Sequence, residues 1–203
     1  MKVIPSIALP SGHYFSLVDH VIIRRQFLPM KAKIKLMKKL LAALFALTLL
    51  GLTPASAHQP VLLRDTDTTP AKGPLLVDGT VSFAVQASFA KAGQKKAFRA
   101  ALKDGDQLAV QYLIIDQPPS NRLKNNRLPE VTITAPDGKK TIMKITERTV
   151  FYEKYSGTNY FYLSRLSAPA KAGIYSFVIT ARAKSAVTIA VGEQEIPGDV
   201  IRK

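Results

Sequence analysis

Histidine is the residue type best suited to acid–base or metal chemistry, and this chain of 203 residues contains three, at His13, His20 and His58. The chain has no cysteine, which excludes thiolate zinc sites and cysteine nucleophiles. It also contains no G-x-S-x-G sequence, the elbow that presents a nucleophilic serine in many hydrolases. Because acid–base catalysis relies most often on histidine, so few candidates predict a protein that is not an enzyme.

Cleavage of a predicted export signal would remove His13 and His20 and leave His58. Residues 40–52 form an apolar run, and Ala55 and Ala57 supply the small residues of an A-x-A cleavage site. The positive region before the run contains Lys31, Lys33, Lys35, Lys38 and Lys39. We therefore expect residues 37–57 to form a signal-peptide helix that is cleaved after Ala57, so that His58 becomes the N-terminus of an exported protein.

The residues before this signal show neither helical nor strand periodicity. We expect residues 1–36 to be an upstream extension or leader, with translation starting at Met1, Met30 or Met37. The apolar run has 13 residues, whereas a membrane-spanning helix needs about 20. The exported protein is therefore expected to have no transmembrane span and to be periplasmic or secreted.

An N-terminal histidine offers an amine and an imidazole that together can chelate one copper ion. A complete copper site of this kind needs a second histidine, and residues 58–203 contain only His58. No cluster of methionine or cysteine replaces it. The pattern favours no cofactor, and copper at His58 remains the alternative.

Residues 58–203 are basic. They contain 21 of the 29 basic residues and 13 of the 14 acidic residues, which gives a net charge of +8. A positive charge favours anionic neighbours, such as envelope polymers or lipid headgroups. Nucleic acid is not expected as a partner of an exported protein.

Strand signals dominate the remaining sequence. Alternation of apolar and polar residues begins at Gly79, and turn residues recur at intervals of about 8–12 residues. Pro136-Asp137-Gly138 and Ser156-Gly157-Thr158 each predict the turn of a hairpin. We predict an all-β, antiparallel β-sandwich or jelly roll of about 8–9 strands over residues 79–192, with an extended arm over 58–78 and a tail over 193–203.

Tyrosines gather around the second predicted hairpin, and their flat rings and hydroxyl groups suit sugar binding. The candidates are Tyr152, Tyr155, Tyr160 and Tyr162. Strand alternation places Tyr152 on one face with Tyr160 and Tyr162, and Phe151 on the other with Tyr155. Cross-strand aromatic pairs also stabilise sheets, so the cluster fits either role. These residues make glycans a further candidate partner.

Three turn motifs resemble the β-sandwich of the bacterial pre-peptidase C-terminal family. They are Gly105-Asp106 before a strand, Pro136-Asp137-Gly138 between strands, and Gly173 followed by Tyr175, and the similar region covers residues 96–192. This resemblance implies a non-catalytic accessory module that assists a separate secreted enzyme. No catalytic domain accompanies the region in this chain.

These observations lead to three hypotheses about function. The first is an exported, non-catalytic binding or structural module of the bacterial cell envelope. The second is a periplasmic copper-handling protein that uses His58. The third is an accessory domain for a secreted enzyme.

Overall fold

The computed structural model describes residues 37–38, 58–154 and 156–202. Met37 and Lys38 are helical, and they are the described residues of an N-terminal unit that ends at Thr53. Ala55, Ala57 and most of the expected signal peptide lie outside the described residues, as does Tyr155. No helix within the described part of the chain is long and apolar enough to cross a membrane.

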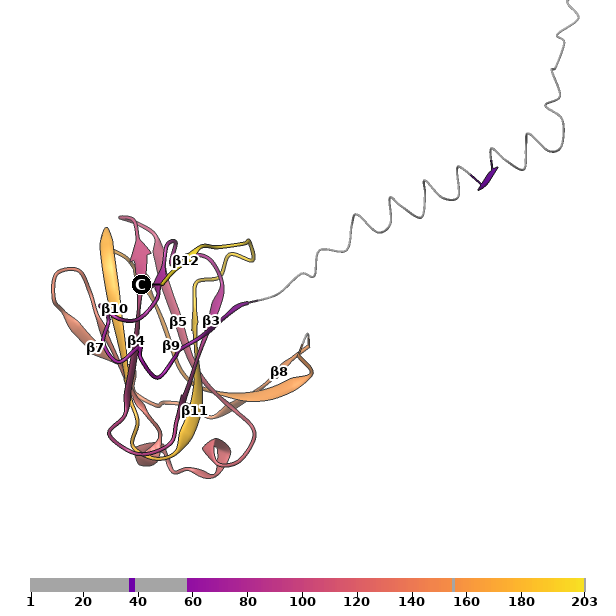
Figure 1. Ribbon diagram of the computed structural model, residues 1–203, viewed down its shortest axis with the longest axis vertical. Coiled ribbons are helices and arrows are strands. Elements are labelled where there is room, and N and C mark those ends of the chain that lie inside the picture. Colours follow the sequence, from indigo (N-terminus) through magenta and orange to yellow (C-terminus); the bar gives the residue numbers. More distant parts are fainter. Residues whose placement is uncertain (1–36, 39–57, 155, 203) are drawn as a thin grey trace, which may run out of the picture. The chain divides into compact units, whose positions relative to one another are not determined.

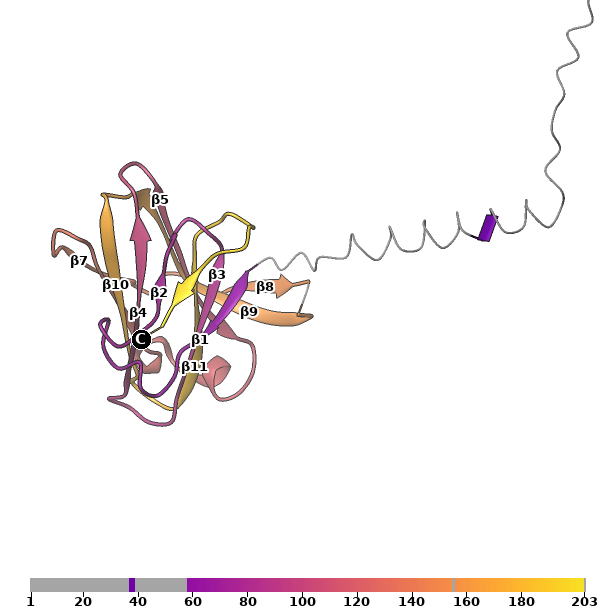
Figure 2. The ribbon, with the colours of Figure 1, turned by 45° about the horizontal axis from the view of Figure 1, so that its top comes forward.

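The second unit is all-β, as the sequence predicts, and its strands form two six-stranded sheets (Figures 1 and 2). Sheet A has the order β1 (Gln59–Leu62), β3 (Phe83–Phe89), β11 (Ser185–Val191), β5 (Gln107–Ile115), β9 (Thr158–Pro169), β8 (Thr149–Glu153). Sheet B has the order β12 (Val200–Ile201), β2 (Leu75–Leu76), β4 (Lys95–Leu102), β10 (Gly173–Thr180), β6 (Glu130–Thr134), β7 (Lys140–Ile142). Two single-turn 3-10 helices, Ser120–Arg122 and Asn125–Arg127, lie in the loop between β5 and β6.

The core lies between the two sheets and follows the alternation of the sequence. Val85 of β3, Ile189 of β11 and Tyr112 of β5 point inward from sheet A and are fully buried. Phe98 of β4 and Phe177 of β10 point inward from sheet B, and their rings stack with centroids 4.4 Å apart. Burial of these faces accounts for the sandwich, because each sheet removes one apolar face from water.

Both predicted hairpins are present. β6 and β7 pair across Pro136-Asp137-Gly138, and Gly138 has the positive φ of 83° that residues other than glycine rarely adopt. β8 and β9 pair across the second turn, where Gly157 has a φ of 63°. The glycine positions read from the sequence are therefore those at which the backbone conformation requires this residue.

The structure adds edge strands in the segments flanking residues 79–192, so that the described residues form twelve strands. β1 pairs in parallel with β3, and β2 pairs in parallel with β4, which makes both sheets mixed. In the C-terminal segment, β12 pairs with β2, and Arg202 forms an ion pair of 3.2 Å with the buried Asp67. The residues expected to be an arm and a tail therefore complete the edges of the sandwich.

Candidate ligand-binding groove

A groove of about 320 Å³ lies on the outer face of sheet A. Its floor comes from β3, β11 and β5, whose side chains in the lining are small or polar except for Leu113. Two cross-strand pairs, Ala84 with Ala190 and Gln86 with Thr188, form the centre of this floor, and Gln111 and Leu113 of β5 extend it. The volume is at the lower end of the range for pockets that bind small molecules.

The hairpin of β8 and β9 forms one wall of the groove. Its strands carry Phe151, Glu153, Tyr160 and Tyr162, and its turn carries Ser156. Figures 1 and 2 show this hairpin projecting beyond the packed sheets. Cover from this wall explains why Leu113 points away from the core and is nevertheless only 5% exposed.

An irregularity in β9 accompanies the projection of the hairpin. Tyr112 of β5 is opposite Ser164, whereas the next residue, Leu113, is opposite Tyr162, so Leu163 is an extra residue in the ladder. Such a bulge bends its strand and increases the local twist. It also reverses the alternation, because Tyr162 faces the groove while Leu163 is fully buried in the core.

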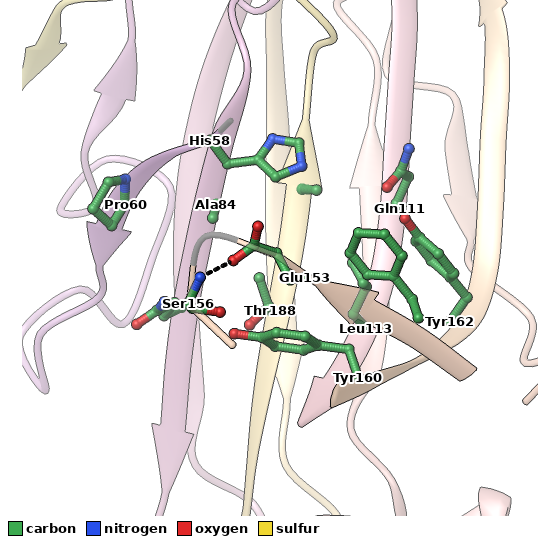
Figure 3. Close-up of a pocket in the computed structure, with 13 residues that line it drawn as sticks. His58, Pro60, Ala84, Gln111, Leu113, Glu153, Ser156, Tyr160, Tyr162 and Thr188 are labelled. Atoms are coloured by element: carbon green, nitrogen blue, oxygen red, sulfur yellow. Dashed lines mark hydrogen bonds between the residues drawn. The ribbon is translucent and has the colours of Figure 1, made fainter. Parts of the chain in front are cut away.

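The second wall lies across the sheet, at the beginning of β1. His58 and Pro60 line it, and Figure 3 shows the Glu153 carboxylate between the His58 ring and Ser156. The Ser156 backbone N–H donates a hydrogen bond of 2.6 Å to the Glu153 carboxylate, which orients this side chain at the groove. The Nδ1 atom of His58 is hydrogen-bonded to the Ser82 hydroxyl.

Burial makes the groove almost uncharged. Removal from water lowers the pKa of His58 below its ordinary value, and the nearby Glu195 and Glu153 carboxylates offset this only in part. The imidazole is therefore neutral at pH 7. Among the described residues that line the groove, Glu153 then carries the only charge, although the protein as a whole is basic.

The two tyrosines of the wall are neutral hydrogen-bonding groups. Burial raises the pKa of Tyr160, the Glu153 carboxylate raises it further, and a hydrogen bond with the Ser156 side chain opposes these effects. Burial likewise raises the pKa of Tyr162. Both phenols keep their protons at pH 7, so each presents an apolar ring and a hydroxyl group.

The tyrosine rings have different surroundings. The Arg165 guanidinium lies 4.0 Å from the centroid of the Tyr162 ring, and the Phe151 ring lies 5.0 Å from the same centroid. Tyr162 is therefore fixed by protein neighbours. Tyr160 extends over the floor near Thr188, with its hydroxyl group directed toward Ser156 (Figure 3). Tyr160 is thus the ring best placed to stack on a ligand.

The structure brings together residues that the sequence singled out separately. His58, from the copper hypothesis, lines the same groove as Tyr160 and Tyr162, from the aromatic cluster. The predicted grouping of faces was wrong for the first strand of the hairpin, because Phe151 is opposite Tyr160 and Tyr152 is opposite Asn159. Tyr152 consequently points away from the groove and is 55% exposed.

The floor of the groove was not predicted from the sequence. Gln86 and Gln111 are the amide side chains that face the ligand space, and Thr188 adds a hydroxyl group. These residues lie at outward positions of alternating strands, where polar side chains usually face only water. They differ from other outward-facing polar residues only because the β8–β9 hairpin lies beside them. No local pattern in the sequence predicts that long-range contact.

No group of three or more histidine, aspartate or glutamate side chains able to hold a metal ion occurs among the described residues. Comparison of the chain with models of known protein families and with characterised proteins finds no match. The proposal of a function therefore depends on the residues that line the groove.

Proposed function

We propose that this protein is an exported, non-catalytic binding module of the bacterial cell envelope, and that its ligand is an uncharged sugar chain held in the groove. The observation that supports this most directly is the composition of the groove. The floor combines the amide side chains of Gln86 and Gln111 and the Thr188 hydroxyl group with apolar side chains, and Tyr160 adds an aromatic ring beside it. Sugars have apolar faces that stack on aromatic rings and hydroxyl groups that hydrogen-bond to amides.

The Glu153 side chain favours a neutral ligand over an anionic one in the part of the groove next to it, while the amino group that cleavage would create at His58 lies at the other wall. An anionic polymer would bring its charges next to the Glu153 carboxylate in a partly buried site, where repulsion is stronger than in water. The net charge of +8 can still attract anionic polymers or lipid headgroups to the remaining surface. The groove and the basic surface then have different partners.

Binding to purified glycans tests the proposal. N-acetylglucosamine oligomers are a suitable neutral probe, because the acetamido group combines an amide for Gln86 or Gln111 with a methyl group for Ala84 or Ala190. Isothermal titration calorimetry should give saturable binding that Tyr160→Ala weakens. Product analysis after prolonged incubation should show no cleavage. Absence of binding to neutral glycans of several classes would overturn the assignment.

Copper handling is a second candidate, favoured by the position of His58 at the edge of the groove beside Glu153. Chelation with the N-terminal amine requires the Nδ1 atom, which is hydrogen-bonded to Ser82, so copper would have to displace the hydroxyl group. Copper titration of the processed protein and its His58→Ala variant tests this candidate. Equal binding by the two proteins would exclude it.

A further inference from the structure

A second, smaller cavity adjoins the groove on the outer face of sheet A. It has a volume of about 140 Å³, which is below the size of about 300 Å³ at which pockets for small molecules begin. Leu62 and Ile115 form apolar walls, and Ser88 and Ala186 lie at its base. Leu62 is 63% exposed, so an apolar surface is open to a ligand there.

The groove, which is the larger cavity, and the smaller cavity share residues and lie along the same pair of strands, β3 and β11. Gln86, Tyr160 and Thr188 line both. Along β3 and β11, the cross-strand pairs follow in order: Ala84 with Ala190, Gln86 with Thr188, and Ser88 with Ala186. Since a strand rises about 3.3 Å per residue, the floor from Ala84 to Ser88 is about 13 Å long.

Tyr160 stands at the boundary between the cavities. It lines the larger cavity together with His58 and Glu153, and the smaller cavity together with Leu62 and Ile115. Its ring lies near Thr188, with its hydroxyl group directed toward Ser156 (Figure 3). One aromatic side chain therefore contributes to both parts of the ligand space.

We propose that the two cavities form one binding site with two subsites, one on each side of Tyr160, and that the ligand is a linear chain of at least two sugar units laid along β3 and β11. This inference rests on the proposed function and specifies the form of its ligand. One unit occupies the larger cavity beside Glu153. The next unit passes Tyr160 and covers the exposed Leu62.

The dependence of affinity on chain length tests this proposal. Calorimetric titration of the protein, produced from the full chain, would use N-acetylglucosamine as the monomer, dimer and tetramer. We expect the dimer and tetramer to bind about tenfold more tightly than the monomer, because the second unit gains its own apolar and stacking contacts. Equal affinities for all three lengths would overturn the two-subsite proposal but leave sugar binding intact.

A variant that fills only the smaller cavity makes the test specific. Ala186→Tyr places a ring there, and Ser176→Tyr, on the outer face of β10 in sheet B, is the matched control. Ala186→Tyr should preserve monomer affinity and remove the advantage of longer chains, whereas the control should behave as the original protein. A length advantage that survives Ala186→Tyr contradicts the proposal. If no length binds the original protein, both the proposed function and this inference fail.

Discussion

The rings of Phe151 and Tyr162 lie 5.0 Å apart at an interplanar angle of 40°, one from each strand of the hairpin that forms a wall of the groove. Tilted pairs at this distance are favourable between aromatic rings. Together with Arg165, which lies over Tyr162, this contact stiffens the hairpin where it projects from sheet A. The wall is therefore formed before a ligand arrives.

Replacement of Tyr160 by alanine should weaken the binding of N-acetylglucosamine oligomers by about tenfold, because one stacking surface is lost. Tyr152→Ala is the matched control, since it removes the same side chain from the opposite face of the same hairpin. Calorimetric titration of both variants checks the expectation, with melting temperatures measured in parallel. Similar affinity losses in the two variants would show that the groove is not the binding site.

Neutralising Glu153 should change selectivity more than affinity for neutral sugars. In Glu153→Gln, the side-chain carbonyl can still accept the Ser156 backbone N–H, but the negative charge is absent. We expect binding of an anionic oligogalacturonate to strengthen about two- to fivefold, the range of single charge interactions near a surface. Glu147→Gln removes a carboxylate that pairs with Arg165 outside the lining of the groove, and it should not have this effect.

His58 should make stability depend on pH. Burial lowers its pKa in the folded state, so between the folded and unfolded pKa values the unfolded chain binds more protons. The free energy of unfolding therefore rises with pH across this window, and it falls as the pH is lowered from about 6.5 toward the folded pKa. Urea denaturation at pH 8, 6.5 and 5 should show that the free energy of unfolding falls more steeply with decreasing pH in the original protein than in His58→Gln. The same pH dependence of the unfolding free energy in both proteins would show that protonation of His58 does not affect stability.

The stacked pair of Phe98 and Phe177 should be central to stability. Both rings are fully buried, so Phe177→Ala should lower the free energy of unfolding by about 3–5 kcal/mol. Ile174, on the same strand, is 45% exposed, and Ile174→Ala should change it by no more than about 0.5 kcal/mol. Chemical denaturation measures both values. A small effect of Phe177→Ala would contradict the packing of the two sheets.

The central strands of the fold could be predicted because the alternation of apolar and polar residues in their own sequence shows which side chains are buried. In β3 and β10, inward and outward residues alternate, and Gly138 and Gly157 mark turns whose conformation favours glycine. The edge strands could not be predicted in this way. β2 and β12 have two residues each, and their pairing with residues distant in sequence leaves no periodic pattern.

The candidate site could be predicted only in part. The predicted cleavage site singled out His58, and the clustering of aromatic residues at the predicted hairpin singled out Tyr160 and Tyr162. The face of each hairpin residue depends on register, and the assumed register placed Tyr152 with the wrong neighbours. Gln86 and Thr188 are opposite each other across two strands that are about 100 residues apart in sequence, a relationship set by tertiary structure.

Nuclear magnetic resonance of the side-chain amides tests the central claim, that a sugar chain binds in this groove, most directly. Titration of the nitrogen-15-labelled protein with the N-acetylglucosamine tetramer should shift the amide signals of Gln86 and Gln111, which line the groove. The signal of the exposed Gln117, outside the lining, should stay in place. Binding that leaves the signals of Gln86 and Gln111 unmoved, or shifts confined to sheet B, would contradict the account.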